Sequence, residues 1–97
     1  MDIKFLKPAQ TELDDAFFYY EDQLDGLGKR FLDEIIQSVK RIQKNPTSWS
    51  PFSENTRRCL TNKFPYAIIY QIRESEILVV AIAHLQRKPG YWENRLS

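Results

Sequence analysis

The most informative polar cluster of this chain follows its last apolar run, Ile77 to Ala83. His84 ends the run, and Arg87, Tyr91 and Trp92 come soon after it. An imidazole can transfer a proton near neutral pH, whereas guanidinium and aromatic groups can orient an anionic partner. Functional sites are commonly built where buried strands end. These residues therefore form the candidate site, either for proton transfer or for binding.

Each candidate also has a plainer structural interpretation. His84 can cap its strand and hydrogen-bond a backbone carbonyl. Tyr91 and Trp92 can fold back over a sheet as core, with their polar atoms at its rim. Arg57 and Arg58 are adjacent on a predicted strand and point to opposite faces, so at most one of them belongs to the site.

Length and composition exclude several classes of protein. The 97 residues suit one domain, which is predicted to cover residues 1–97. The chain has one cysteine, Cys59, and one histidine, so neither a disulfide nor a structural zinc site is expected, and no cofactor is implied. No apolar run reaches the ~18 residues of a membrane span. Because Met1 to Phe5 also lacks the order of a signal peptide, the protein is predicted to be cytoplasmic.

The charge of the chain is nearly balanced but unevenly distributed. A net charge of +1 argues against a strong nucleic-acid binder. Residues 1–48 hold seven Lys and Arg against nine Asp and Glu, whereas residues 49–97 hold seven against four. The basic excess therefore accompanies the candidate site. A patch of this size could orient an anionic partner, and it is as typical of a solvated sheet edge.

Apolar periodicity predicts the elements that must position this site. A short strand at residues 3–6 precedes two helical stripes, which Gly26 to Gly28 separate and Pro46 ends. Residues 45–56 are rich in Pro, Ser, Thr and Asn and are predicted to form a loop. The remaining elements are strands over residues 57–64, 66–73 and 77–83 and a last helical turn within residues 89–96.

The order β-α-α-β-β-β predicts an α+β fold. We expect an antiparallel sheet with an αα-hairpin packed on one face and a short C-terminal helical turn. Glu74 to Glu76 is polar and short enough for a hairpin turn, so residues 66–73 and 77–83 should be antiparallel neighbours. The first strand should join the sheet at an edge.

Several short motifs occur in order along this scaffold. They are Tyr19-Tyr20-Glu21, Gly26-Leu27-Gly28-Lys29-Arg30-Phe31, Asn45-Pro46, Arg57-Arg58, Phe64-Pro65-Tyr66 and finally His84, Arg87, Pro89 and Trp92. With these motifs nearly the whole chain resembles the RelE/ParE superfamily of type II toxin–antitoxin toxins, nearer its ParE-like branch. The resemblance implies a RelE/ParE-like fold and a growth-arresting toxin of the plasmid stabilisation type. It also implies a cognate antitoxin that silences the toxin in a hetero-oligomer.

The superfamily has two target classes, and the near-neutral charge favours the first. ParE-like members resemble inhibitors that bind DNA gyrase, and binding needs no general base. The aromatic stretches around Tyr66 and Tyr91 fit that class. The resemblance then implies that a basic and aromatic surface contacts the target, through Arg58, Lys63, Arg87, Trp92 and Arg95.

The alternative class resembles ribosome-dependent mRNA endoribonucleases of the RelE type. Such cleavage needs a base or polarising cation for the 2′-OH, charge stabilisation on the phosphoryl oxygens and a proton donor for the leaving oxygen. In that case His84, Arg87 and Tyr91 would be catalytic, and Arg58 or Lys63 would help to bind the RNA. A third possibility is an inactive module that only binds an antitoxin.

The expected antitoxin contact is limited by the cost of ordering a disordered segment. Such a segment must bury enough apolar surface to offset that cost. We expect an amphipathic helix or an added strand whose acidic residues face the basic C-terminal half. Leu6, Tyr20, Leu24 and Trp49 could offer part of an apolar groove for it.

Overall fold

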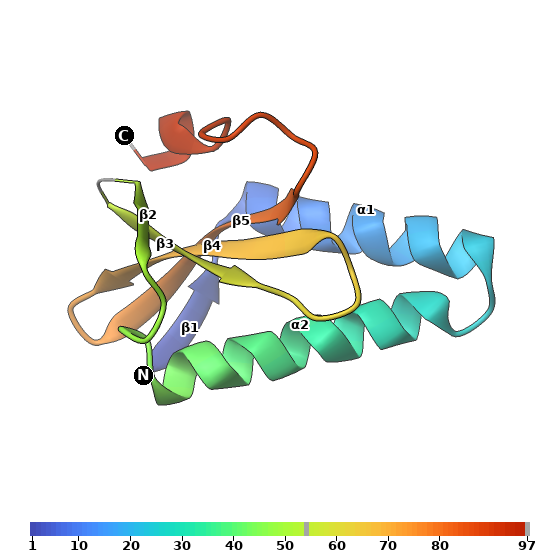
Figure 1. Ribbon diagram of the computed structural model, residues 1–97, viewed down its shortest axis with the longest axis horizontal. Helices are drawn as coiled ribbons and strands as arrows, with labels where there is room; N and C mark the ends of the chain where they lie inside the picture. Colours follow the sequence, from blue (N-terminus) through green and yellow to red (C-terminus); the bar gives the residue numbers. More distant parts are fainter. Residues whose placement is uncertain (54, 97) are drawn as a thin grey trace.

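The computed structural model describes residues 1–53 and 55–96, which form two helices and a five-stranded sheet with strand order β1-β5-β4-β3-β2 (Figure 1). The elements in chain order are β1 (Asp2–Phe5), α1 (Lys7–Gln23), α2 (Leu27–Lys44), β2 (Pro51–Ser53), β3 (Thr56–Leu60), β4 (Tyr66–Arg73), β5 (Glu76–His84) and the short 3-10 helix η1 (Glu93–Leu96). The predicted α+β class is confirmed. The two helices form the expected antiparallel hairpin, and β4 and β5 pair antiparallel, as predicted.

The sheet is mixed, which corrects the expectation of a wholly antiparallel one. Strand β1 joins at an edge, as expected, but it pairs parallel with β5. All other neighbouring strands pair antiparallel. A crossover connection permits parallel pairing, and the helical hairpin that follows β1 is such a connection. The sequence pattern of β1 carries no information about its direction.

Two further boundaries differ from the prediction. Strand β2 lies within the predicted loop of residues 45–56, and its Pro51 is tolerated because β2 is an edge strand. The strand predicted over residues 57–64 ends at Leu60. There the hydroxyl of Thr61 donates to the carbonyls of Phe64 and Tyr66 and closes a turn. Lys63 lies in that turn with a φ of 70° and is not a strand residue.

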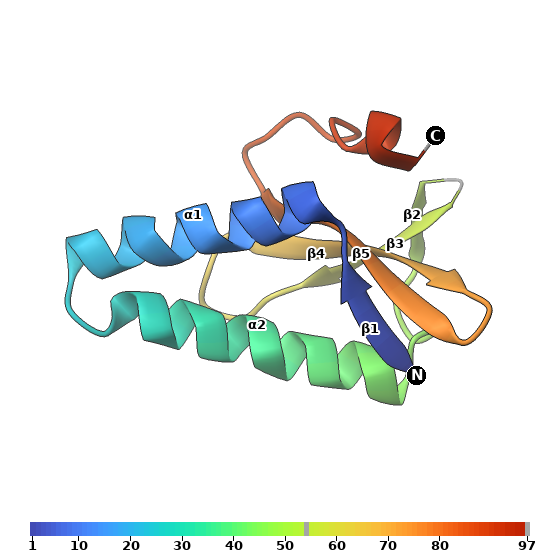
Figure 2. The same cartoon turned by 180° about the vertical axis from the view of Figure 1, so that it is seen from behind.

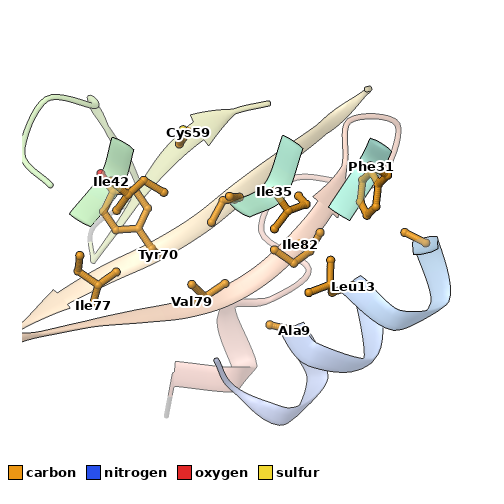
Figure 3. Packing of buried hydrophobic residues seen from close by; sticks show 12 residues of the cluster. Ala9, Leu13, Phe31, Ile35, Ile42, Cys59, Tyr70, Ile77, Val79 and Ile82 are labelled. Carbon is orange, nitrogen blue, oxygen red and sulfur yellow. The ribbon is translucent and has the colours of Figure 1, made fainter. Parts of the chain in front are cut away.

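One face of the sheet carries the main core, beneath both helices. Ala9 and Leu13 of α1 and Phe31 and Ile35 of α2 are buried against it (Figure 3). The side chains that β3, β4 and β5 contribute to this face are Cys59, Ile68, Tyr70, Ile77, Val79 and Ile82. Both helices therefore cover one face, as the sequence predicts.

The opposite face is covered by residues 85–96, which we call the C-terminal segment (Figures 1 and 2). A bulge in β5 gives this face an additional apolar side chain. Ile69 pairs with Ala81 and Tyr70 with Val79, so Val80 is the extra residue. Val80 and Ala81 consequently both turn away from the helices. The sheet thus has an apolar second face on which the C-terminal segment can pack.

The helical hairpin is closed by a carboxylate and a close backbone approach. Glu21 near the end of α1 accepts hydrogen bonds from the backbone N–H groups of Gly26 and Gly28, at 2.9 and 3.0 Å. These N–H groups would otherwise be unpaired at the start of α2. A Cβ atom at Gly28 would lie 2.6 Å from the carbonyl oxygen of Phe17, so the two helices pack too closely there for any side chain.

We expect Gly28→Ala to lower the free energy of unfolding by roughly 2 kcal/mol, because the helices must separate to admit the methyl group. Gly26→Asn is the matched control. Gly26 has a φ of 86° but nothing within 4 Å of a Cβ position, and asparagine tolerates that conformation. Urea unfolding of both variants measures the difference. Equal midpoints for Gly28→Ala and the wild type would show that the hairpin is not tightly packed.

Candidate functional site at the C-terminal segment

The C-terminal segment is held by one carboxylate, that of Glu12 in α1. Both terminal nitrogens of Arg95 donate to it, at 2.9 and 3.0 Å. The hydroxyl of Tyr91 donates at 2.6 Å, and the backbone N–H of Ile82 donates at 3.1 Å. Glu12 therefore joins helix α1, strand β5 and the C-terminal segment.

This arrangement also satisfies an unpaired stretch of the sheet. Strand β1 ends opposite Val79, so β5 has no strand neighbour on that side from Val80 onward. The carbonyl of Val80 accepts a hydrogen bond from Arg95 at 3.0 Å, and Glu12 accepts from Ile82. Glu12 and Arg95 thus make hydrogen bonds to β5 that a neighbouring strand would otherwise make. These bonds stabilise backbone groups that would be costly to bury unpaired.

The pKa values of the groups around Glu12 are shifted in the direction this network requires. The hydrogen bond to Glu12 raises the pKa of the Arg95 guanidinium. Burial, and then the hydrogen bond to Glu12, raises the pKa of the Tyr91 phenol well above its usual range. Tyr91 consequently stays neutral, with its proton directed at Glu12. As a proton donor to a substrate it would first have to give up this contact.

His84 is the last residue of β5, but its backbone partner is an N–H group and not the predicted carbonyl. Its ring packs edge-to-face on Tyr66, with 5.0 Å between the ring centroids. Its Nδ1 accepts a hydrogen bond from the backbone N–H of Gln86 at 3.1 Å. In the sheet register His84 lies opposite Tyr66, three residues from Ile69, the partner of Arg58. Since side chains alternate between faces, His84 and Arg58 point to opposite sides of the sheet.

Five side chains on the second face form a continuous stack. The guanidinium of Arg58 lies 4.3 Å above the ring of Phe52, which stacks on Trp92 at 5.6 Å. Trp92 meets Tyr91 edge-to-face at 5.3 Å, and Arg87 covers the other side of Tyr91 at 3.8 Å. We call these five residues the arginine–aromatic stack. Trp92, at its centre, is only 3% exposed.

The structure brings most of the predicted site residues together. A depression of about 40 Å³ is bordered by both arginines of the stack and by Phe52, Tyr91 and Trp92. His84 reaches its rim from the end of β5, but the His84 ring packs on Tyr66 and is directed toward the other face. Two predicted residues lie elsewhere. Arg95 faces Glu12, and Lys63 lies in a second groove beside α2, with Arg30 and Glu34. The candidate site is therefore the arginine–aromatic stack, and Lys63 is not part of it.

The sequence interpretation missed Glu12. Glu12 is one of several acidic residues on α1, so its charge alone does not distinguish it. A signal was nevertheless present, because Ala9, Glu12 and Ala16 share one face of the helix at i, i+3 and i+7 spacing. An acidic residue within a buried apolar stripe needs a cationic partner.

Metal-ligand clusters and membrane-spanning helices are both absent from the part of the chain that the structure describes. Within residues 1–53 and 55–96, no three His, Cys, Asp or Glu side chains gather as metal ligands do. In the same residues no helix is both long and apolar enough to cross a membrane.

Comparison with known proteins agrees with the architecture. Residues 3–89 match the family model described as the ParE toxin of the type II toxin–antitoxin system parDE. The structure resembles that of a chromosomal ParDE toxin–antitoxin system from P. aeruginosa, with a TM-score of 0.75 and 19% sequence identity. The alignment covers 89% of this chain and 97% of the other. No curated protein sequence matches the chain.

Proposed function

Because this chain belongs to the ParE toxin family of type II toxin–antitoxin systems, we propose that it arrests growth by binding DNA gyrase. A cognate antitoxin, encoded beside it, would silence it in a hetero-oligomeric complex. The P. aeruginosa structure that it resembles is a toxin–antitoxin system of the same family name. The resemblance in sequence and fold supports the antitoxin partner, and the target is argued from the site.

The observation that carries the proposal is the arginine–aromatic stack itself. It is a preformed surface on which Arg58, Arg87 and Tyr91 are accessible and buried Trp92 supports the rings. Arg and Tyr are among the residue types that dominate the binding energy of protein interfaces. Binding a target protein requires an accessible surface of this kind and no general base or acid. Inhibition of gyrase by binding therefore fits the side chains present.

The same geometry speaks against the endoribonuclease alternative. His84 already accepts a hydrogen bond at Nδ1, and the proton of Tyr91 is directed at Glu12. Asp15 also lines a groove that Arg87 and Tyr91 border, where it would repel a phosphate backbone. An RNA-cleaving site needs an available base and acid together with a field of cations. These contacts support binding over cleavage.

The apolar groove expected for the antitoxin is not continuous. Leu6, Tyr20 and Trp49 pack against the main core, whereas Leu24 is 59% exposed at the tip of the helical hairpin. Helix α2 lies between Leu24 and Trp49, and its 18 residues span roughly 27 Å. These four side chains cannot form one groove. An antitoxin segment would have to bind along the helical hairpin or at a sheet edge.

We expect that expression of the chain alone stops growth, and that co-expression with the adjacent antitoxin restores it through a complex that can be purified. His84→Ala should remain toxic, because binding needs no base. Growth curves, the state of translated mRNA and induction of the DNA-damage response are the measurements. Thermal unfolding of the purified variant confirms that it is folded.

Each possible target gives a different result in this experiment. Arrest with intact mRNA and a DNA-damage response supports gyrase as the target. Arrest with cleaved mRNA that disappears in a folded His84→Ala variant would replace the proposal with ribosome-dependent cleavage. An absence of arrest would indicate an inactive module that only binds an antitoxin.

A further inference from the structure

The two ends of the arginine–aromatic stack are cations with unused hydrogen-bonding capacity. Arg58 is exposed, and its guanidinium lies above the ring of Phe52. The side chain of Arg87 is 55% exposed and comes no closer than 3.9 Å to Glu12. Arg95, by contrast, is neutralised by two short hydrogen bonds to Glu12. Among the described residues, Arg58 therefore has no carboxylate partner, and Arg87 has only a long ion pair to a carboxylate that Arg95 already holds.

An aromatic ring lies beneath each of these two guanidinium groups, with 4.3 Å between Arg58 and the Phe52 ring and 3.8 Å between Arg87 and the Tyr91 ring. The N–H groups of a guanidinium above a ring remain available to a partner, and their planar arrangement matches a carboxylate in bidentate fashion. The rings beneath both groups are held in turn by Trp92, which is buried. Little side-chain entropy remains to be lost when a partner binds.

The depression bordered by Arg58 and Arg87 is small and carries no negative charge. Its volume is about 40 Å³, and none of the described residues that line it is Asp or Glu. Its other borders are apolar or aromatic side chains and His84. A space of this size suits one small anionic group better than a nucleobase or a ring.

We infer that this depression receives an aspartate or glutamate side chain of the protein that the toxin binds. The inference rests on the proposed function, since gyrase is the protein in question. A nucleic acid is the less suitable partner, because phosphate binding gains from many cations and this patch offers two. The chain as a whole has a net charge of only +1.

The test measures binding of the purified toxin to purified gyrase by calorimetry, at two salt concentrations. Arg58→Ala and Arg87→Ala should each weaken binding by about 30-fold, the loss typical of an interface hot spot. Arg87→Lys should recover only part of the loss, because an ammonium group cannot bind bidentately. Lys88→Ala is the matched control, since Lys88 is an exposed neighbouring cation outside the stack. It should bind like the wild type.

Every other outcome overturns the inference in a recognisable way. If the wild type does not bind gyrase, the proposed function and this inference both fail. If the wild type binds and the double alanine variant binds equally well, the inference alone fails. Loss of affinity for a DNA duplex without gyrase, with a steep salt dependence, would identify a phosphate as the ligand. Loss confined to the antitoxin complex would assign the carboxylate to the antitoxin.

Discussion

Glu12→Ala is expected to lower the free energy of unfolding by about 3 kcal/mol and to abolish the proposed inhibition of gyrase. The change removes the acceptor for the Arg95 guanidinium, the Tyr91 hydroxyl and the backbone N–H of Ile82. A donor that is left buried without an acceptor costs its full desolvation energy, and a buried charge without a partner costs more. The C-terminal segment should then lose its fixed position, and the arginine–aromatic stack with it.

Two variants separate this effect from a general loss of acidic charge. Glu12→Gln keeps an acceptor oxygen but loses the charge opposite Arg95, so its stability should lie between those of Glu12→Ala and the wild type. Asp14→Ala removes an exposed acid from the same helix and should change stability by less than about 0.5 kcal/mol. Urea unfolding and a supercoiling assay measure both properties. A Glu12→Ala protein as stable as Asp14→Ala would contradict the role assigned to this carboxylate.

Removing the chain from Tyr91 onward is expected to abolish toxicity completely. The deletion takes away Trp92, which is buried on the second face of the sheet, together with Tyr91 and Arg95. The family match ends at residue 89, so the truncated chain still contains all the matched residues. Growth of cells that express the truncated chain is the measurement. Continued arrest would place the toxic surface elsewhere on the molecule.

Single substitutions of Trp92 separate loss of the surface from loss of stability. Trp92→Ala should cost about 3 to 5 kcal/mol of stability, the usual loss for a large buried aromatic side chain. Trp92→Phe should cost much less. Among the described residues the indole N–H is buried without a hydrogen-bond partner, and phenylalanine removes that unpaired group while keeping most of the apolar contact. Thermal unfolding compares the two variants. Equal losses would show that the indole N–H contributes to stability after all.

The sequence predicted the parts of this fold that depend on local pattern. The helical stripes, the strands over residues 66–73 and 77–83 and the hairpin between them are all recognisable from apolar spacing, because each buries one face against a common core. The direction of β1 and the existence of β2 were not predictable in this way. The direction of β1 depends on its pairing with β5, which is more than 70 residues away in the sequence. Strand β2 pairs with the adjacent β3, but a strand of three residues has no periodicity to detect.

The candidate site was predictable in residue type but not in arrangement. His84, Arg87, Tyr91 and Trp92 do gather near the end of β5, since they follow one another closely in the chain. Lys63 lies apart from these residues, because β3 ends at Leu60 and is followed by a turn that Thr61 closes. The pairing of Glu12 with Arg95 could not be predicted from the sequence, because the two residues are 83 positions apart and only the fold brings them together.

The pairing of Glu12 with Arg95 also affects how the protein is made. These residues are 83 positions apart, and a ribosome makes a chain from its N-terminus onward. Glu12 therefore leaves the exit tunnel early, and Arg95 leaves it 83 residues later. A nascent chain therefore exposes its helical hairpin to a binding partner before its arginine–aromatic stack can assemble. Chains that end prematurely, for instance on a broken message, never acquire the surface at all.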